Sequence, residues 1–125
     1  MSFFSSMLGN SGVVDPQKLR DDYGRLLAHG EVIEVGFAVV RATFVFTTKR
    51  LILVDVQRLT GKKIEYLSIP YSKLTTFSIE TAENFDLDAE LKLWVGSDPN
   101  SIEKRFNKGI DIYDLQSVLA RHVLS

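Results

Sequence analysis

The chain of 125 residues contains no cysteine. This absence excludes disulfides, thiolate nucleophiles and metal sites with cysteine ligands, and it fits a reducing compartment. No stretch approaches the roughly 20 consecutive apolar residues of a membrane-spanning helix. Residues 1–12 lack both the basic start and the sustained apolar stretch of a signal peptide. We therefore expect a cytoplasmic protein.

An excess of basic residues is also absent. The formal net charge is −1, with 15 Lys and Arg against 16 Asp and Glu. The chain as a whole lacks the positive charge that is typical of nucleic-acid-binding proteins, so we expect no nucleic-acid partner. The hydrophobic fraction of 45% and the charged fraction of 25% are those of an ordinary globular protein. The length favours one domain with one core.

Catalytic and cofactor-binding motifs are missing as well. The sequence has no Gly-x-Ser-x-Gly, His-Glu-x-x-His or Gly-x-Gly-x-x-Gly motif, and Gly61-Lys62-Lys63 lacks the rest of a phosphate-binding loop. His29 and His122 have no companion ligands at metal-site spacing, and the acidic residues of 86–90 alternate along an expected strand. The sequence therefore predicts that the chain is not an enzyme and has no catalytic, cofactor-binding or metal-binding residues.

What the sequence does contain is a series of short segments with alternating apolar residues, which predicts strands. In the strand expected at 51–56, Asp55 interrupts the face that carries Leu51 and Leu53. We therefore expect the opposite face, which begins at Ile52, to be the core side. Seven strands are expected, within 31–40, 44–47, 51–56, 64–69, 74–80, 87–95 and 102–106.

Helices are predicted at the two ends of this series. Asp15-Pro16 is a strong helix start, and Gly30 a reasonable stop, so the first helix is expected over 15–29. The second helix is expected over 111–124, with one apolar stripe. This stripe suits a helix that covers the open end of a strongly bent sheet. The predicted class is α+β, mainly β, with a single domain over 15–125.

Large apolar residues outside the expected core are candidates for contacts. Residues 1–14 are expected to form a flexible arm, which carries Phe3 and Phe4. This arm is either mobile or docked on its own domain, or it packs on a neighbour or a membrane surface. Trp94 is expected on the polar face of its strand, where it is either sheltered by the chain itself or part of an interface.

Four stretches are distinctive, at 44–51, 55–57 with 59–63, 66–73 and 85–91. These stretches resemble the bacterial pleckstrin-homology (PH) domain family, and the order of seven antiparallel strands and a C-terminal helix is the layout of the PH superfold. The resemblance implies a partly open barrel, made by a bent seven-stranded antiparallel sheet and capped by the C-terminal helix, with the first helix as an addition. It also implies homo-oligomeric rings, but no specific activity.

Two functional hypotheses follow. The first is a non-catalytic interaction and assembly module that forms homo-oligomers through sheet edges and outward aromatic residues. The second is an anionic lipid or membrane-surface binder that uses the basic turn residues Arg58, Lys62 and Lys63. Eukaryotic phosphoinositide-binding PH domains place basic residues in the turn between the first two strands, where this chain has only Arg41. Another protein remains a possible partner.

Overall fold

A computed structural model describes residue 4 and residues 12–57, 63–81, 89–107 and 111–125. As predicted, the chain forms seven antiparallel strands with a helix at each end. The helical elements are α1 (Pro16–Tyr23), the 3₁₀ turns η2 (Gly24–Leu26) and η3 (Tyr71–Lys73), and α2 (Ile112–Val123). The strands are β1 (Ile33–Val39), β2 (Ala42–Thr47), β3 (Arg50–Gln57), β4 (Lys63–Pro70), β5 (Leu74–Glu80), β6 (Ala89–Val95) and β7 (Ile102–Phe106).

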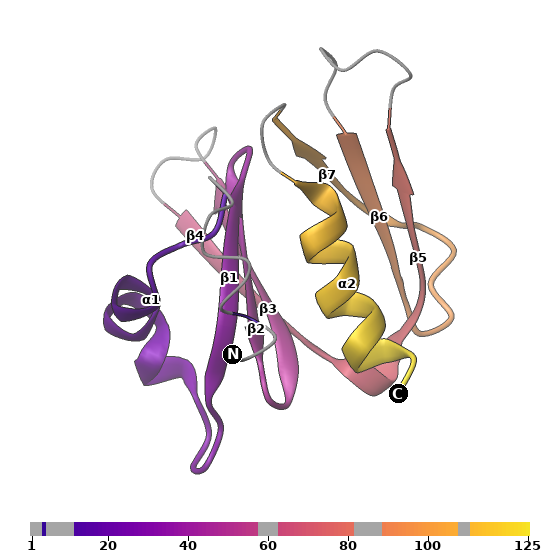
Figure 1. Ribbon diagram of the computed structural model, residues 1–125. Coiled ribbons are helices and arrows are strands. Elements are labelled where there is room, and N and C mark those ends of the chain that lie inside the picture. The colour runs from indigo at the N-terminus through magenta and orange to yellow at the C-terminus, as the bar shows by residue number, and fades with distance from the viewer. Residues whose placement is uncertain (1–3, 5–11, 58–62, 82–88, 108–110) are drawn as a thin grey trace.

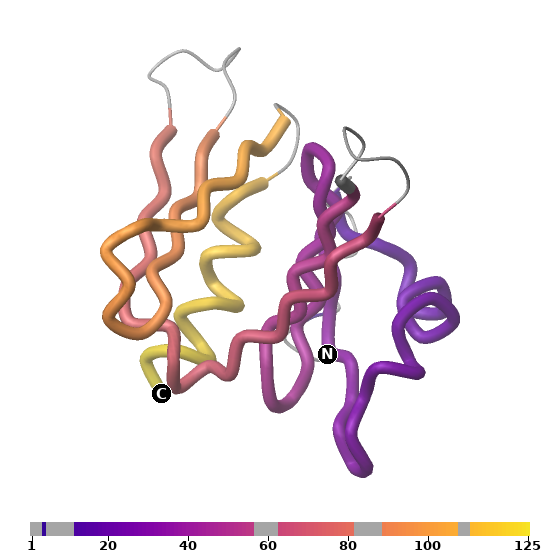
Figure 2. The backbone as a smooth tube through the Cα atoms, turned by 180° about the vertical axis from the view of Figure 1, so that it is seen from behind, coloured from indigo at the N-terminus to yellow at the C-terminus, as the bar shows by residue number. Residues whose placement is uncertain are grey.

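The seven strands divide into two sheets. The first has the order β1-β2-β3-β4 and the second β5-β6-β7, and the strands of the described residues do not close into a barrel. Figure 1 shows α2 running between the two sheets, with α1 on the far side of the first sheet, and Figure 2 shows the same order from behind. The predicted PH-like fold with its capping helix is therefore confirmed, as two sheets around α2.

The main core lies between the sheets and is completed by α2. Burying one such side chain stabilises the fold by about 1.5–3 kcal/mol. The apolar stripe predicted for the last helix is the face of α2 that enters this core. The fully buried members from these elements are Phe37, Phe44, Phe46, Leu51, Ile69, Leu91, Leu93, Phe106, Leu115, Val118 and Leu119.

A second, smaller core lies between α1 and the outer face of the first sheet, and it corrects the prediction for β3. Leu51 and Leu53 belong to the main core, whereas Ile52 and Val54 belong to the smaller cluster with Leu19 of α1. The predicted core side was wrong because both faces of β3 are covered. The polar residue that interrupts the Leu51 face is directed toward the other sheet rather than toward solvent.

The first helix is shorter than predicted. Asp15 caps it by accepting a hydrogen bond from the Lys18 N–H, but the α-helix ends at Tyr23 and continues only as η2. The groups that would extend the helix have other partners. The Leu26 carbonyl accepts a hydrogen bond from Arg50 at 2.6 Å, and the Ala28 N–H donates to the Glu31 carboxylate at 2.8 Å.

The segment before α1 lies along the free side of β1. Val13 forms a single antiparallel bridge with Phe37, with hydrogen bonds from the Val14 N–H to the Gly36 carbonyl and from the Ala38 N–H to the Gly12 carbonyl. The last residues of the predicted 1–14 arm are thus docked on the sheet. In the described part of the chain, neither helix is long and apolar enough to cross a membrane.

Candidate functional site

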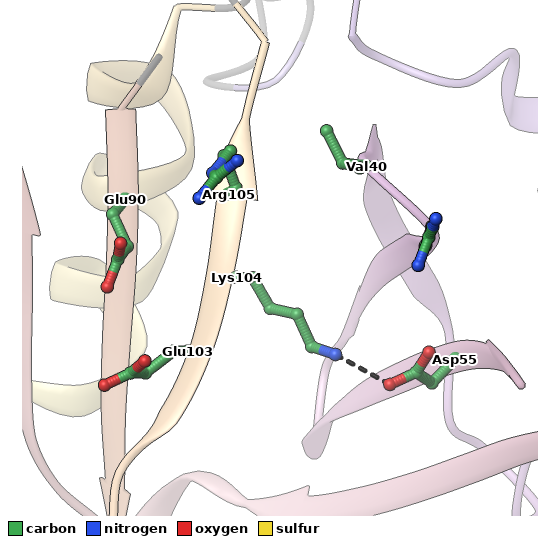
Figure 3. Close-up of a pocket in the computed structure, with 7 residues that line it drawn as sticks. Val40, Asp55, Glu90, Glu103, Lys104 and Arg105 are labelled. Atoms are coloured by element: carbon green, nitrogen blue, oxygen red, sulfur yellow. Dashed lines mark hydrogen bonds and ion pairs between the residues drawn. The ribbon is translucent and has the colours of Figure 1, made fainter.

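The first candidate site is a cleft of about 510 Å³ at the open end of the two sheets. It lies between the turn joining β1 and β2, the end of β3, and strands β6 and β7 of the second sheet (Figure 3). Three consecutive residues of β7 line it, so the edge of that strand forms one wall. The lining residues are Val40, Arg41, Asp55, Glu90, Glu103, Lys104 and Arg105.

An ion pair across this cleft joins the two sheets. Lys104 is opposite Leu91 in the β6–β7 pairing, which places it on the core-facing side of β7. Its Nζ extends to Asp55 Oδ2 of β3 at 2.6 Å (Figure 3). Asp55 is itself opposite Glu65 of β4, a like-charged cross-strand pair that is unfavourable by itself. The positive charge of Lys104 therefore offsets the repulsion between Asp55 and Glu65 at this end of the two sheets.

The positive and negative charges of the side chains that line the cleft are balanced. Its lining has three basic and three acidic side chains, and one of each is already paired with the other. Within the described ranges, no group of three or more His, Asp or Glu residues is arranged to hold a metal ion. The cleft can bind polar groups by hydrogen bonds, but its lining presents no nucleophile beside a base.

The second candidate site is a groove of about 320 Å³ on the outer face of the first sheet. One wall is α1, with Asp21, Asp22 and Tyr23, and the floor is formed by β2, β3 and β4. Tyr23 contacts Tyr66 of β4 edge to face, with ring centroids 6.5 Å apart. The groove is less charged than the cleft because its floor is largely apolar.

Three of the residues that line this groove form an apolar strip that reaches the edge of the sheet. It consists of Val56, Ile64 and Tyr66, with exposed fractions of 38%, 48% and 45%. Val56 is directly opposite Ile64 in the β3–β4 pairing, so the three side chains share one face. Beyond the strip, β4 has no further strand partner in the described part of the molecule. Exposed apolar residues beside an unpaired strand edge are typical of an interaction surface.

The predicted contact residues lie in different places. Lys63 is exposed at the start of β4, whereas Arg58, Lys62 and Phe3 lie outside the described residues. Phe4 packs against the main core. Trp94 of β6 is half-buried and pairs directly with Thr76 of the neighbouring strand β5. Its role in an interface stays a prediction.

Two polar clusters were not predicted, because each joins residues far apart in the sequence. Arg50 binds the buried Glu31 through two hydrogen bonds of 2.9 and 3.0 Å. His122 Nε2 lies 2.6 Å from Glu34 Oε1, and its ring stacks on Tyr71 at 4.1 Å. The Tyr71 hydroxyl donates to the Thr47 carbonyl, and burial raises the pKa of Tyr71.

Comparison with known proteins agrees with this architecture. Two relatives from Bacillus subtilis (strain 168) carry the descriptions "Uncharacterized protein YjqA" and "Uncharacterized protein YozO". YjqA is 46% identical over 121 residues, which cover 96% of this chain and 97% of YjqA. YozO is 34% identical over 100 residues, which cover 80% of this chain and 85% of YozO.

Two solved structures are also similar. A pleckstrin homology domain from Shewanella amazonensis SB2B is 42% identical, with a TM-score of 0.81, over 89% of this chain and all of that one. A DUF1696 family protein with a pleckstrin-homology domain from Shewanella loihica PV-4 is 40% identical, with a TM-score of 0.77, over 91% of this chain and 97% of that one. The family model for the bacterial PH domain matches residues 2–123. The chain belongs to the bacterial PH domain family.

Proposed function

We propose that this PH-like domain is a non-catalytic interaction module that associates with further copies of itself. The observation that carries the proposal is the edge of β4, which has no further strand partner among the described residues, together with the apolar strip of Val56, Ile64 and Tyr66. An unpaired strand presents a row of N–H and C=O groups that another strand can bind, and the neighbouring apolar residues add burial. The resemblance to domains that form rings supports the same conclusion.

The self-association is tested by the mass of the protein in solution. Light scattering coupled to size exclusion, over a wide range of protein concentrations, should give a mass that is a multiple of 14.1 kDa. A mass that grows with concentration would indicate a weak assembly, and a constant multiple a stable one. A mass of one chain at every concentration would overturn the proposal.

Binding to an anionic membrane surface is the second proposed function. It is favoured by Lys63, which is exposed and forms no ion pair with the described residues. Each basic residue near an anionic surface contributes about 1 kcal/mol. If Arg58 and Lys62 act with Lys63, the protein will sediment with anionic vesicles at low salt, and replacing all three by glutamate will abolish this. Failure of the wild-type protein to sediment would overturn the lipid function.

A further inference from the structure

Two tyrosine rings line the groove between α1 and the first sheet. Tyr23 is the last residue of α1 and Tyr66 belongs to β4, so the pair connects the helix with the sheet. The ring centroids are 6.5 Å apart and the ring planes are inclined at 69°. Tyr66 is 45% exposed and Tyr23 is half-buried. The two rings therefore form the sides of an accessible aromatic corner in the wall of the groove.

A negative charge lies next to this corner. Asp21 and Asp22 of α1 line the same groove and directly precede Tyr23 in the chain. The Asp22 carboxylate is bound to Lys18 Nζ at 2.8 Å, whereas Asp21 Oδ1 accepts a hydrogen bond of 2.8 Å from the neutral amide of Gln17. Among the described residues, no cation forms an ion pair with Asp21. Its charge is therefore not balanced within this part of the chain.

The rest of the lining excludes several kinds of ligand. Its uncharged members, apart from the tyrosines, are Ala42, Thr43, Val54, Val56 and Ile64. The two aspartates and one basic residue, Arg25 of η2, give the described lining a formal net charge of −1. A phosphate or carboxylate would face two carboxylates, and a neutral apolar molecule would leave the charge of Asp21 unbalanced. A cation with an apolar surface meets neither difficulty.

The chemistry of the groove narrows this class further. The face of a tyrosine ring attracts a positive charge, and the attraction is stronger when the cation is desolvated. A nitrogen surrounded by alkyl groups has no N–H donor to leave unpaired on the apolar floor. A primary ammonium ion would lose hydrogen bonds to water when it entered such a groove. The volume of about 320 Å³ lies at the lower end of the range for small-ligand sites.

We infer that this groove binds a small quaternary ammonium ion, with its alkyl groups against Tyr23 and Tyr66 and its charge balanced by Asp21. The same chemical group occurs in soluble compounds and in lipid head groups. The site goes beyond the proposed self-association and does not rest on it, because the groove lies on a face of the first sheet whereas strand pairing uses the edge of β4. The apolar strip borders both, so the variants that test the site keep the strip apolar.

Choline and its neutral isostere neohexanol, in which a carbon atom replaces the nitrogen, test the role of the charge. Titrations of the isotope-labelled full chain are followed by NMR through the ring signals of Tyr23 and Tyr66. Choline should shift these signals saturably, and neohexanol should bind at least about fivefold more weakly. Equal affinities, or no saturable shift with choline, would overturn the inference. Sedimentation with phosphatidylcholine vesicles would identify a lipid head group as the source of the cation, and its absence a soluble compound.

Three variants locate the site. Tyr23→Leu and Tyr66→Leu keep apolar side chains but remove the aromatic faces, and Asp21→Asn removes the charge from an exposed position of α1. Each should weaken choline binding by at least about fivefold and leave the circular dichroism spectrum unchanged. Tyr113→Leu is the matched control, because Tyr113 is an exposed tyrosine on α2, and it should bind choline like the wild type. Wild-type affinity in both Tyr23→Leu and Tyr66→Leu would overturn the assignment to this groove.

Light scattering separates this site from self-association. A mass of several chains without choline binding would overturn the ammonium site and leave self-association standing. Choline binding by a protein with the mass of one chain would overturn self-association and leave the ammonium site standing.

Discussion

At the scale of single residues, the carboxylate of Glu31 has an unusually complete set of donors. It accepts hydrogen bonds from the Arg50 guanidinium, the Thr47 hydroxyl and the Ala28 N–H. Burial alone would raise the pKa of Glu31. The hydrogen bonds from Arg50 and Thr47, with the backbone bond and the charge of Arg50, outweigh burial and lower this pKa to about 2. The carboxylate therefore stabilises the folded chain in its charged form.

This pKa predicts a pH dependence of the free energy of unfolding. Because the folded pKa is below the ordinary value of 4.5, the contribution is fully present above about pH 4.5 and is lost as the pH falls toward 2. Glu31→Gln should lower the free energy of unfolding at neutral pH by on the order of 3 kcal/mol. The difference from wild type should shrink as the pH falls toward 2.

The measurement is urea unfolding at a series of pH values and one fixed protein concentration, because self-association couples to stability. Glu80→Gln is the control. Glu80 is exposed, and its Lys92 ion pair, at 3.6 Å, is expected to contribute little. A difference between wild type and Glu31→Gln that stays constant from neutral pH to pH 2 would contradict the assigned role of this carboxylate.

At the scale of elements, the docking of α1 depends on one glycine. A Cβ at Gly36 of β1 would lie 2.5 Å from a methyl carbon of Leu19, and Leu19 is fully buried. Gly36→Ala should therefore lower the free energy of unfolding by about 1–3 kcal/mol through overpacking. Leu19→Ala should lower it by about 2–4 kcal/mol through the cavity that it leaves. The double variant should lose less than the sum.

Chemical denaturation of the four proteins measures this coupling. Gly24→Ala is the matched control, because a Cβ at Gly24 meets nothing within 4 Å and its φ of −56° is helical. It should be neutral or slightly stabilising. Strictly additive effects of Gly36→Ala and Leu19→Ala would show that the two positions are not in contact.

Local patterns explain which elements could be predicted from the sequence. Alternation with a period of two, and for β3 a short apolar run rich in β-branched residues, identified the strands, and Asp111 with the apolar stripe identified α2. The end of α1 was not predicted, because Arg50, whose side chain binds the Leu26 carbonyl, lies 24 residues further along the chain.

The candidate sites were harder to predict for the same reason. Asp55 and Lys104 are 49 residues apart, and His122 and Glu34 are 88 apart, so no spacing rule connects them. When the position of the other sheet is unknown, a charged residue on an otherwise apolar strand face predicts that this face is exposed to solvent. Asp55 was therefore assigned to the wrong environment. The apolar strip was visible as Ile64 and Tyr66, but its exposure depends on which strand is left at the edge.

At the scale of the whole molecule, the Asp55–Lys104 ion pair connects the two sheets at the end where the cleft opens (Figure 3). Lys104→Met should lower the free energy of unfolding by about 1–3 kcal/mol, because it leaves Asp55 facing Glu65 without a compensating charge. Asp55→Asn should cost less in the Lys104→Met background than in wild type.

A double-mutant cycle by urea unfolding at fixed protein concentration measures this interaction, and we expect a coupling energy of about 1–2 kcal/mol. The control cycle is Lys92→Met with Glu80→Gln, a pair within the second sheet in which the Glu80 side chain is 68% exposed. Its coupling should be near zero because exposed ion pairs are screened. Equal coupling in the two cycles would contradict a specific role for Asp55–Lys104. A larger coupling only for Asp55–Lys104 would show that the sheets are joined electrostatically at the cleft as well as through the core around α2.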